Sequence, residues 1–266
     1  MGSPEEGREH IPGPLATCPA GRVVVVTGGA SGMGLSVSRR LAAAGDRVAV
    51  FDRDGARAQR AAEGIRASGG SAMACEVDVT DRPAVEEAVR KVRAEWGPVQ
   101  VLVTSAGVFA FEDFTDISIE SWNRIIDVNL NGTFHCVQAV IPDMVAAGWG
   151  RIVTISSSSA QRGSPKMVHY TASKGAVIAM TKALAREYAT RGITVNTIPP
   201  SGIDTPMSRD SQSAGHLPDN ETMARAIPVG YLGNGEDIAA ACEFLCSADA
   251  RFITGQVVGV NGGAVI

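Results

Sequence analysis

The sequence has no strong excess of charge and no apolar run long enough to cross a membrane. Its 24 basic and 28 acidic residues give a formal net charge of −4, which excludes the dense positive field that attracts nucleic acid or an anionic membrane surface. A membrane-spanning helix needs about 18 consecutive apolar residues, and no segment approaches that length. We therefore expect neither nucleic acid nor a membrane as a partner.

Cysteines and aromatic residues are also few. The cysteines are odd in number, scattered and without the spacing of metal ligands: Cys18, Cys75, Cys136, Cys242 and Cys246. This pattern predicts no metal site, and reduced, mostly buried thiols in a cytoplasmic protein. The first 20 residues lack the apolar core of a signal peptide, so we interpret 1–20 as a mobile leader. The aromatic content of 5% argues mildly against a flat, stacked substrate.

Short runs of successive apolar, mostly β-branched residues alternate with segments of helical length. The runs lie at 23–26, 48–51, 101–103, 152–155 and 193–198, and the helical segments at roughly 32–44, 54–68, 81–96, 118–147, 168–190 and 235–247. Strands that are apolar at every position are typical of a parallel sheet covered by helices on both faces. We therefore predict a single α/β domain over 21–266, with a doubly wound, Rossmann-like sheet of about seven strands. The irregular stretch at about 199–234 is expected to be a substrate loop and not a domain boundary.

The segment 27–34 reads TGGASGMG and joins the first predicted strand to the first helix. Glycines permit a tight turn close to a pyrophosphate, and the N–H groups and dipole at a helix start favour its negative charge. The pattern is GxxxGxG and not the commoner GxGxxG, so a merely structural turn is the alternative. The expected cofactor contacts are Gly28, Ser31, Gly32, Met33 and Gly34.

Asp52 stands at the end of the second predicted strand. A carboxylate at this point can accept hydrogen bonds from the hydroxyls of an adenosine ribose and would repel a 2′-phosphate. This favours NAD over NADP. Arg53 follows directly and could meet a phosphate, so NADP stays an open alternative.

Tyr170 and Lys174 are spaced four residues apart at the start of a predicted helix and therefore share one helix face. A phenol with a pKa near 10 transfers protons poorly at neutral pH, and a neighbouring cation would lower that pKa. A surface Tyr and Lys would show the same spacing by chance, but Ser157 follows the strand that ends just before this helix. Its hydroxyl is expected at the carboxyl edge of the sheet, where open α/β folds bind ligands. Asn129 is a further polar side chain within a predicted helix.

These motifs together resemble the short-chain dehydrogenase/reductase family, in its short single-domain branch, from about residue 21 to the C-terminus. The matches follow the family's order: the glycine segment at 27–34, Asp78-Val79, Ala106-Gly107, Asn129, Ser157, Tyr170, Lys174, the stretch 203–207, Gly255-Gln256 and Gly262-Gly263.

The resemblance implies a role for each catalytic candidate. Tyr170 would be the general acid/base, and Ser157 would polarise the same substrate oxygen. Lys174 would lower the pKa of Tyr170 and hold the nicotinamide ribose, while Asn129 would anchor a water in a proton relay. The hydride would belong to the cofactor.

The resemblance also implies further cofactor contacts. Asp78 would meet the adenine amino group beside the Val79 backbone, and Ile203 and Thr205 would contact the nicotinamide carboxamide. Two segments depart from the family pattern: 104–107 reads TSAG where the family has NNAG, and a serine separates Pro200 from the following glycine. The remaining expected cofactor contacts are Ser105, Ala106, Gly107 and Pro200.

By the same resemblance, Ser159, Gln161 and Met167 would line the substrate pocket with Ser157 and Tyr170. Because these side chains carry no charge, they indicate a neutral or apolar alcohol as the small-molecule substrate. The family also implies a homotetramer, in which the helices near 118–147 and 168–190 and the tail Gly255–Ile266 meet between subunits.

Three functions stay open. The first is an NAD-dependent dehydrogenase that interconverts a secondary alcohol and a ketone on a hydroxylated ring, a steroid-like compound or a hydroxyacyl compound. The second is an NADPH-dependent 3-oxoacyl-thioester (acyl carrier protein) reductase of the same fold. The third, a non-catalytic dinucleotide sensor, is disfavoured because all four catalytic positions are filled.

Overall fold

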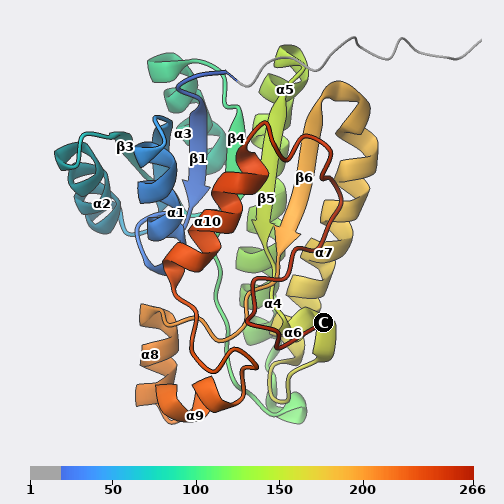
Figure 1. Ribbon diagram of the computed structural model, residues 1–266. Coiled ribbons are helices and arrows are strands. Elements are labelled where there is room, and N and C mark those ends of the chain that lie inside the picture. The colour runs from blue at the N-terminus through green and yellow to red at the C-terminus, as the bar shows by residue number, and fades with distance from the viewer. Residues whose placement is uncertain (1–18) are drawn as a thin grey trace, which may run out of the picture.

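Six apolar runs form the parallel sheet at the centre of the molecule (Figure 1). The strands are β1 (Val23–Thr27), β2 (Arg47–Asp52), β3 (Ser71–Glu76), β4 (Val101–Thr104), β5 (Gly150–Ile155) and β6 (Ile193–Ile198). They lie in the order β3-β2-β1-β4-β5-β6, and every neighbouring pair is parallel. The direction of winding reverses between β1 and β4, so a crevice is expected at their carboxyl ends.

The computed structural model describes residues 19–266. Most of the predicted leader, together with Cys18, falls in residues 1–18 and lies outside the described residues. The other four cysteines are buried: Cys75, Cys136, Cys242 and Cys246.

The described residues form a six-stranded sheet, where about seven strands were predicted. Val257 lies where a seventh strand would pair with β6, but it makes only an isolated parallel bridge to Thr197. Gly255, Gly262 and Gly263 all take positive φ angles, which is incompatible with extended backbone. The tail therefore leaves the sheet after one bridge.

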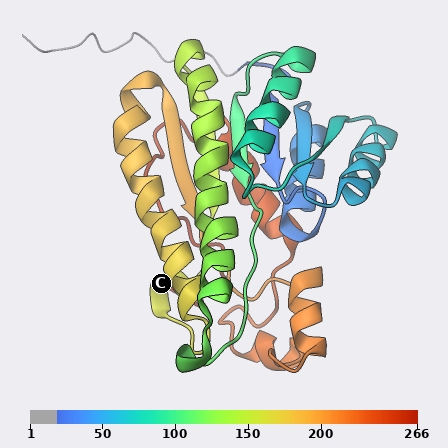
Figure 2. The same ribbon diagram turned by 180° about the vertical axis from the view of Figure 1, so that it is seen from behind.

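Helices cover both faces of the sheet. The helices α1 (Gly32–Ala43), α2 (Gly55–Ala67) and α10 (Gly235–Cys246) pack on the face seen in Figure 1. The helices α3 (Arg82–Trp96), α5 (Gly132–Ala147) and α7 (Val168–Tyr188) pack on the opposite face, seen in Figure 2. The predicted doubly wound α/β architecture is therefore confirmed.

Two predicted segments differ in detail from the structure. The helix expected over 118–147 consists of α4 (Ile119–Ile126), five residues of π-helix (η2, Asp127–Asn131) and α5. The loop expected at 199–234 contains two short helices, α8 (Pro206–Ser213) and α9 (Asn220–Arg225), and the four-residue helix α6 (Ser159–Arg162) follows β5. Side-chain caps explain the helices in the loop: the Thr205 hydroxyl accepts from Ser208 N, and an Asp219 carboxylate oxygen accepts from Thr222 N.

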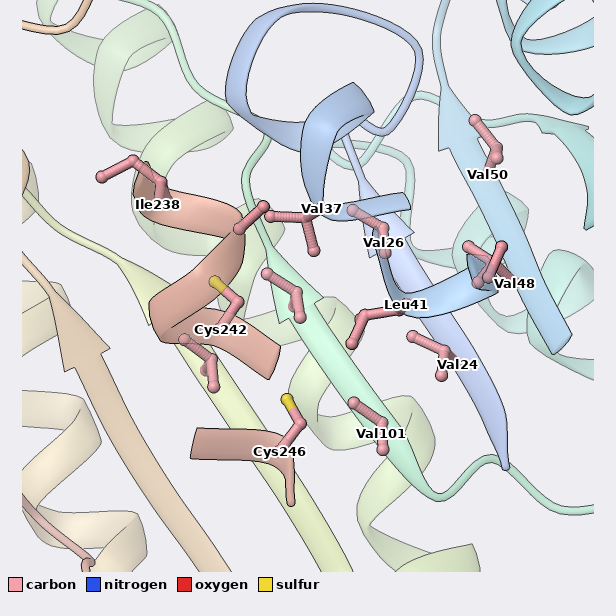
Figure 3. Packing of buried hydrophobic residues seen from close by; sticks show 14 of the residues in the cluster. Val24, Val26, Val37, Leu41, Val48, Val50, Val101, Ile238, Cys242 and Cys246 are labelled. Atoms are coloured by element: carbon pink, nitrogen blue, oxygen red, sulfur yellow. The ribbon is translucent and has the colours of Figure 1, made fainter. Parts of the chain in front are cut away.

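Leu41 on α1 lies in the centre of one face of the core, against Val24, Val26 and Val101 of the sheet (Figure 3). Its side chain is fully buried. We expect Leu41→Ala to lower the free energy of unfolding by about 2–5 kcal/mol, because it removes buried apolar area and leaves a cavity. Urea unfolding followed by circular dichroism measures this change. The matched control is Ile119→Ala at a side chain that is 63% exposed, where a change above about 0.5 kcal/mol would contradict the argument from burial.

No helix among residues 19–266 has both the length and the apolar character needed to cross a bilayer.

Candidate active site

A cleft of about 420 Å³ lies at the carboxyl ends of the central strands. Its size falls in the range of small-molecule sites, about 300–1,000 Å³. Most of the predicted cofactor contacts line it: Gly28, Ser31, Gly32, Met33, Asp52, Arg53, Asp78, Val79, Ser105, Ala106, Gly107 and Thr205. The structure therefore brings these residues together from five separate segments of the chain.

Five predicted cofactor contacts do not line this cleft: Gly34, Pro200, Ile203 and the catalytic candidates Tyr170 and Lys174, which are described below. Gly34 packs inside the glycine turn, where an added Cβ would lie 2.2 Å from the carbonyl oxygen of Gly28. Pro200 is buried, and its carbonyl accepts a hydrogen bond from Ser158 N. Ile203 lines a neighbouring hollow of about 300 Å³ and bridges to Gly233. Contact of all five with a cofactor stays a prediction.

The glycine turn leaves room for a phosphate at the start of α1. Gly28 has a φ of +61° and lies so close to the chain after β4 that an added Cβ would stand 2.9 Å from the Ala106 backbone. Ser31, at the N-cap of α1, makes no capping side-chain hydrogen bond, and the first turn contains no acidic residue. The N–H groups at this helix start are therefore open to an anion. The cradle therefore fits a dinucleotide pyrophosphate, and contact of Ser31, Gly32 and Met33 with it stays a prediction.

Asp52 is held at the end of β2 by backbone donors. Asp54 N donates to its Oδ1 at 3.1 Å, and Ala30 N lies 3.3 Å from its Oδ2. Two cations share this part of the cleft, Arg53 and Arg57. Arg57 Nε is 3.4 Å from the carboxylate of Asp54. The site therefore contains both a ribose acceptor and guanidinium groups able to meet a 2′-phosphate.

The departure at 104–107 has a visible structural consequence. The Thr104 hydroxyl is buried and has no hydrogen-bond partner among the described residues. The turn is closed by Thr27 instead: its hydroxyl accepts from Ala106 N at 3.1 Å, and its carbonyl accepts from Ser105 N at 3.2 Å. Ala106 and Gly107 thereby keep their place along the cleft.

Polar groups from two helices converge on Gly107. An added Cβ there would lie 3.3 Å from Asn129 Oδ1 and 3.4 Å from Lys174 Nζ. Asn129 sits in the π-helix, a feature common at functional sites. Its Oδ1 accepts from Val108 N, while its Nδ2 donates to Val108 O and to Ser173 Oγ. Asn129 thus fixes the chain after β4, and its part in a proton relay stays a prediction.

Lys174 is buried and donates from Nζ to the carbonyl of Ile155 at 2.9 Å. Burial lowers the pKa of its ammonium to about 8. The ammonium therefore lies between the end of β5 and Gly107.

The predicted lowering of the Tyr170 pKa by Lys174 is not what the structure shows. Burial raises the pKa of the Tyr170 phenol, and the group that opposes this rise is Ser157, through a side-chain hydrogen bond. The Ser157 hydroxyl also accepts from Ser159 N at 3.1 Å. Lys174 does not produce the lowering because its ammonium is directed to a backbone carbonyl and is itself destabilised by burial.

The remaining predicted substrate contacts are Ser159, Gln161 and Met167. Ser159 is buried, and its hydroxyl accepts from Ser164 Oγ at 2.8 Å. Met167 is buried at the start of α7, whereas Gln161 is exposed on α6. Their contact with substrate stays a prediction.

Sequence reasoning missed several residues that line the cleft: Arg57, Val77, Val108, Val128, Pro206, Met207 and Asp210. Val108 directly follows the recognised Ala106-Gly107 pair, and Pro206 and Met207 belong to the recognised stretch 203–207. Extending each motif by its neighbours would have found these three. Asp210 lies within the stretch at about 199–234 that is expected to be a substrate loop, but its position at the cleft depends on α8.

The comparisons with known proteins agree with this geometry. A family model described as enoyl-(acyl carrier protein) reductase matches residues 28–265. The 3-oxoacyl-[acyl-carrier-protein] reductase FabG of Escherichia coli (strain K12) is 37% identical over 246 residues, which are 91% of this chain and 97% of the relative. The chain belongs to the short-chain dehydrogenase/reductase family.

Relatives within the family are named for different activities. The 2,5-dichloro-2,5-cyclohexadiene-1,4-diol dehydrogenase LinX of Sphingobium indicum is 37% identical, over 92% of this chain and 96% of its own length. The acetoacetyl-CoA reductase of Shinella zoogloeoides is 40% identical, over 91% and 98%. The solved structure of gox2181 superposes with a TM-score of 0.86 at 34% identity and covers 92% of this chain and 96% of its own.

As a member of the short-chain dehydrogenase/reductase family, the protein is an oxidoreductase that interconverts alcohols and ketones with a nicotinamide cofactor.

Proposed function

We propose that the protein is an NAD-dependent dehydrogenase that interconverts a secondary alcohol and its ketone, with Tyr170 as the general acid/base. The observation that carries the proposal is the grouping of Ser157, Tyr170, Lys174 and Asn129 beside a cleft whose ribose end contains Asp52.

Oxidation of the alcohol requires the transfer of a hydride and of a proton. When bound, the nicotinamide ring supplies the hydride acceptor for alcohol oxidation and the hydride donor for ketone reduction. In oxidation, the Tyr170 oxygen accepts the hydroxyl proton as the carbon–oxygen double bond forms; in reduction, it returns that proton. Ser157 donates to the same substrate oxygen and holds it beside Tyr170. Lys174 binds the nicotinamide ribose through its ammonium group.

The cofactor preference is tested by removing the carboxylate charge of Asp52. We expect Asp52→Asn to lower kcat/KM for NAD by roughly 10–100-fold, because hydrogen bonds to a charged acceptor contribute about 1.5–3 kcal/mol. The value for NADP should rise, since repulsion of a 2′-phosphate is lost. Initial rates of alcohol oxidation with each cofactor measure both changes.

Arg53→Ala is the paired variant. It should leave the NAD rate within about twofold, because the proposal gives the guanidinium no partner on NAD. A parent enzyme that prefers NADP, together with a loss of that preference in Arg53→Ala, would overturn the choice of NAD.

The second candidate is an NADPH-dependent 3-oxoacyl-thioester reductase. It is favoured by Arg53 and Arg57 at the cleft and by the similarity to FabG and acetoacetyl-CoA reductase. Rapid oxidation of NADPH by acetoacetyl-CoA, without turnover of simple secondary alcohols, would select this candidate.

We also propose that the protein assembles as a homotetramer. Large apolar side chains are exposed on α5 and in the C-terminal region, among them Phe134, Phe244 and Phe252, of which Phe252 is 99% exposed. Exposed apolar side chains of this size are typical of surfaces that a second subunit covers. Sedimentation equilibrium of the purified protein tests the assembly.

A further inference from the structure

Two phenylalanines place an aromatic surface directly beside the catalytic tyrosine. The ring of Phe109 lies 5.9 Å from that of Tyr170, centroid to centroid, at an interplanar angle of 75°. Phe111 lies 5.6 Å from Phe109 at 80°. Both contacts have the edge-to-face geometry that aromatic pairs prefer. A continuous aromatic surface therefore starts at the phenol, and we call Phe109 and Phe111 the aromatic wall.

The segment that carries this wall is fixed at both ends. Before it, both backbone groups of Val108 are hydrogen-bonded to the side chain of Asn129. After it, Glu112 N donates to Lys166 O at 2.8 Å, and Lys166 Nζ pairs with Asp113 at 3.1 Å. A surface held in this way loses little conformational freedom when a ligand binds to it.

His169 on α7 lies against the same segment. It precedes Tyr170 on α7, is completely buried, and has no hydrogen bond from either ring nitrogen among the described residues. Its Nε2 is 3.7 Å from the Glu112 carboxylate, which also accepts from Ser121 Oγ. His169 therefore faces the wall segment and not the substrate side of the site.

The wall also reaches the turn between α8 and α9 in the 199–234 segment. Phe111 stacks on His216 at 5.3 Å and 18°. An open hollow of about 280 Å³ lies beside this pair; its lining includes Phe109, Arg124 and His216 but not Phe111. It shares Val108, Met207 and Asp210 with the cofactor cleft, so the two are adjacent. Arg124 and Asp210 bring opposite charges to this hollow, so it has no excess of one sign.

We propose that Phe109 and Phe111 determine substrate specificity by selecting a secondary alcohol with an apolar ring at or next to the carbinol carbon. This inference rests on the proposed function, because it specifies the part of the substrate that carries the hydroxyl which Tyr170 deprotonates. A flat ring gains aromatic contact with the rigid wall at little entropic cost, whereas a linear acyl chain must lose rotational freedom to make the same contact. The hollow of about 280 Å³ suits one or two fused rings.

The test compares a bicyclic secondary alcohol, 1-indanol, with the linear 2-octanol at saturating cofactor. We expect the parent enzyme to prefer 1-indanol in kcat/KM. Phe109→Leu should lower the value for 1-indanol by roughly tenfold while that for 2-octanol stays within about twofold, because leucine keeps the apolar volume and loses only the aromatic face. Phe111→Leu, one ring further from Tyr170, should show the same pattern with a smaller loss. The matched control is Phe114→Leu, at an exposed side chain that lines neither the cleft nor the hollow, which should change neither value.

Three outcomes separate this inference from the proposed function. Selective loss on the bicyclic alcohol supports both. Equal losses on the two alcohols, or a parent preference for 2-octanol, overturn the role of the aromatic wall while the proposed dehydrogenase stands. Turnover of neither alcohol with NAD or NADP overturns the proposed function and the inference with it.

Discussion

Replacing Tyr170 by phenylalanine is expected to lower kcat for alcohol oxidation by about 10²–10⁴-fold, the usual contribution of a positioned acid/base. The substitution removes only the phenolic oxygen, which accepts the proton in the proposed mechanism. The ring that makes the edge-to-face contact with Phe109 is retained, so the site should keep its shape. NAD binding, measured by titration of protein fluorescence, should therefore change by less than about threefold.

A matched control for this variant lies on the same helix. Tyr188 is the last residue of α7 and packs against the core on the opposite side of the sheet from α1. Tyr188→Phe makes the same chemical change away from the cleft and should leave kcat within about twofold. Substantial activity in Tyr170→Phe would show that another group transfers the proton.

Much of the fold is predictable because its strands are buried on both faces. Runs such as 23–26 and 193–198 must lie inside a sheet covered by helices, whatever the rest of the chain does. The helices between them follow from their length and from caps such as Asp81, whose side chain accepts from Ala84 N. The positions of Gly28 and Asp52 along the cleft are also predictable, since both residues belong to the first βαβ unit.

The features that were missed depend on contacts between distant segments. The helices α8 and α9 are each shorter than ten residues, which is too short to produce a clear periodic signal. The seventh strand fails because glycines in the tail take positive φ angles, and a glycine in a sequence does not state its φ.

The aromatic wall was missed for a related reason. The aromatic content of 5% argues mildly against a stacked substrate, but it is an average over the whole chain. Phe109 and Phe111 nevertheless lie beside Tyr170, because the residues on either side of them are fixed by hydrogen bonds: Val108 N donates to Asn129, and Glu112 N donates to Lys166 O. A low overall content therefore says little about one site.

The pKa of Tyr170 was also beyond sequence reasoning. The spacing of Tyr170 and Lys174 shows that they share a helix face, but it does not show how deeply each is buried. Burial raises the pKa of the phenol and lowers that of the ammonium to about 8, so each group resists its charged form.

Lys174→Met is accordingly expected to lower kcat/KM by roughly 10²–10⁴-fold. The variant removes a buried cation that donates to Ile155 O and, in the proposed mechanism, to the nicotinamide ribose; hydrogen bonds from charged groups contribute about 1.5–3 kcal/mol each. The affinity for NAD should fall as well, which distinguishes this variant from Tyr170→Phe.

The pH profile gives the sharper readout. In the parent enzyme, log kcat/KM for oxidation should rise with pH as Tyr170 ionises and bend near pH 8, where Lys174 loses the charge that holds the nicotinamide ribose in the proposed mechanism. In Lys174→Met that bend should be absent, and the residual rate should continue to rise into more alkaline solution. Lys182→Met, an exposed lysine two turns further along α7, is the matched control and should keep the parent profile. A bend near pH 8 that persists in Lys174→Met would assign it to another group and contradict this account of Lys174.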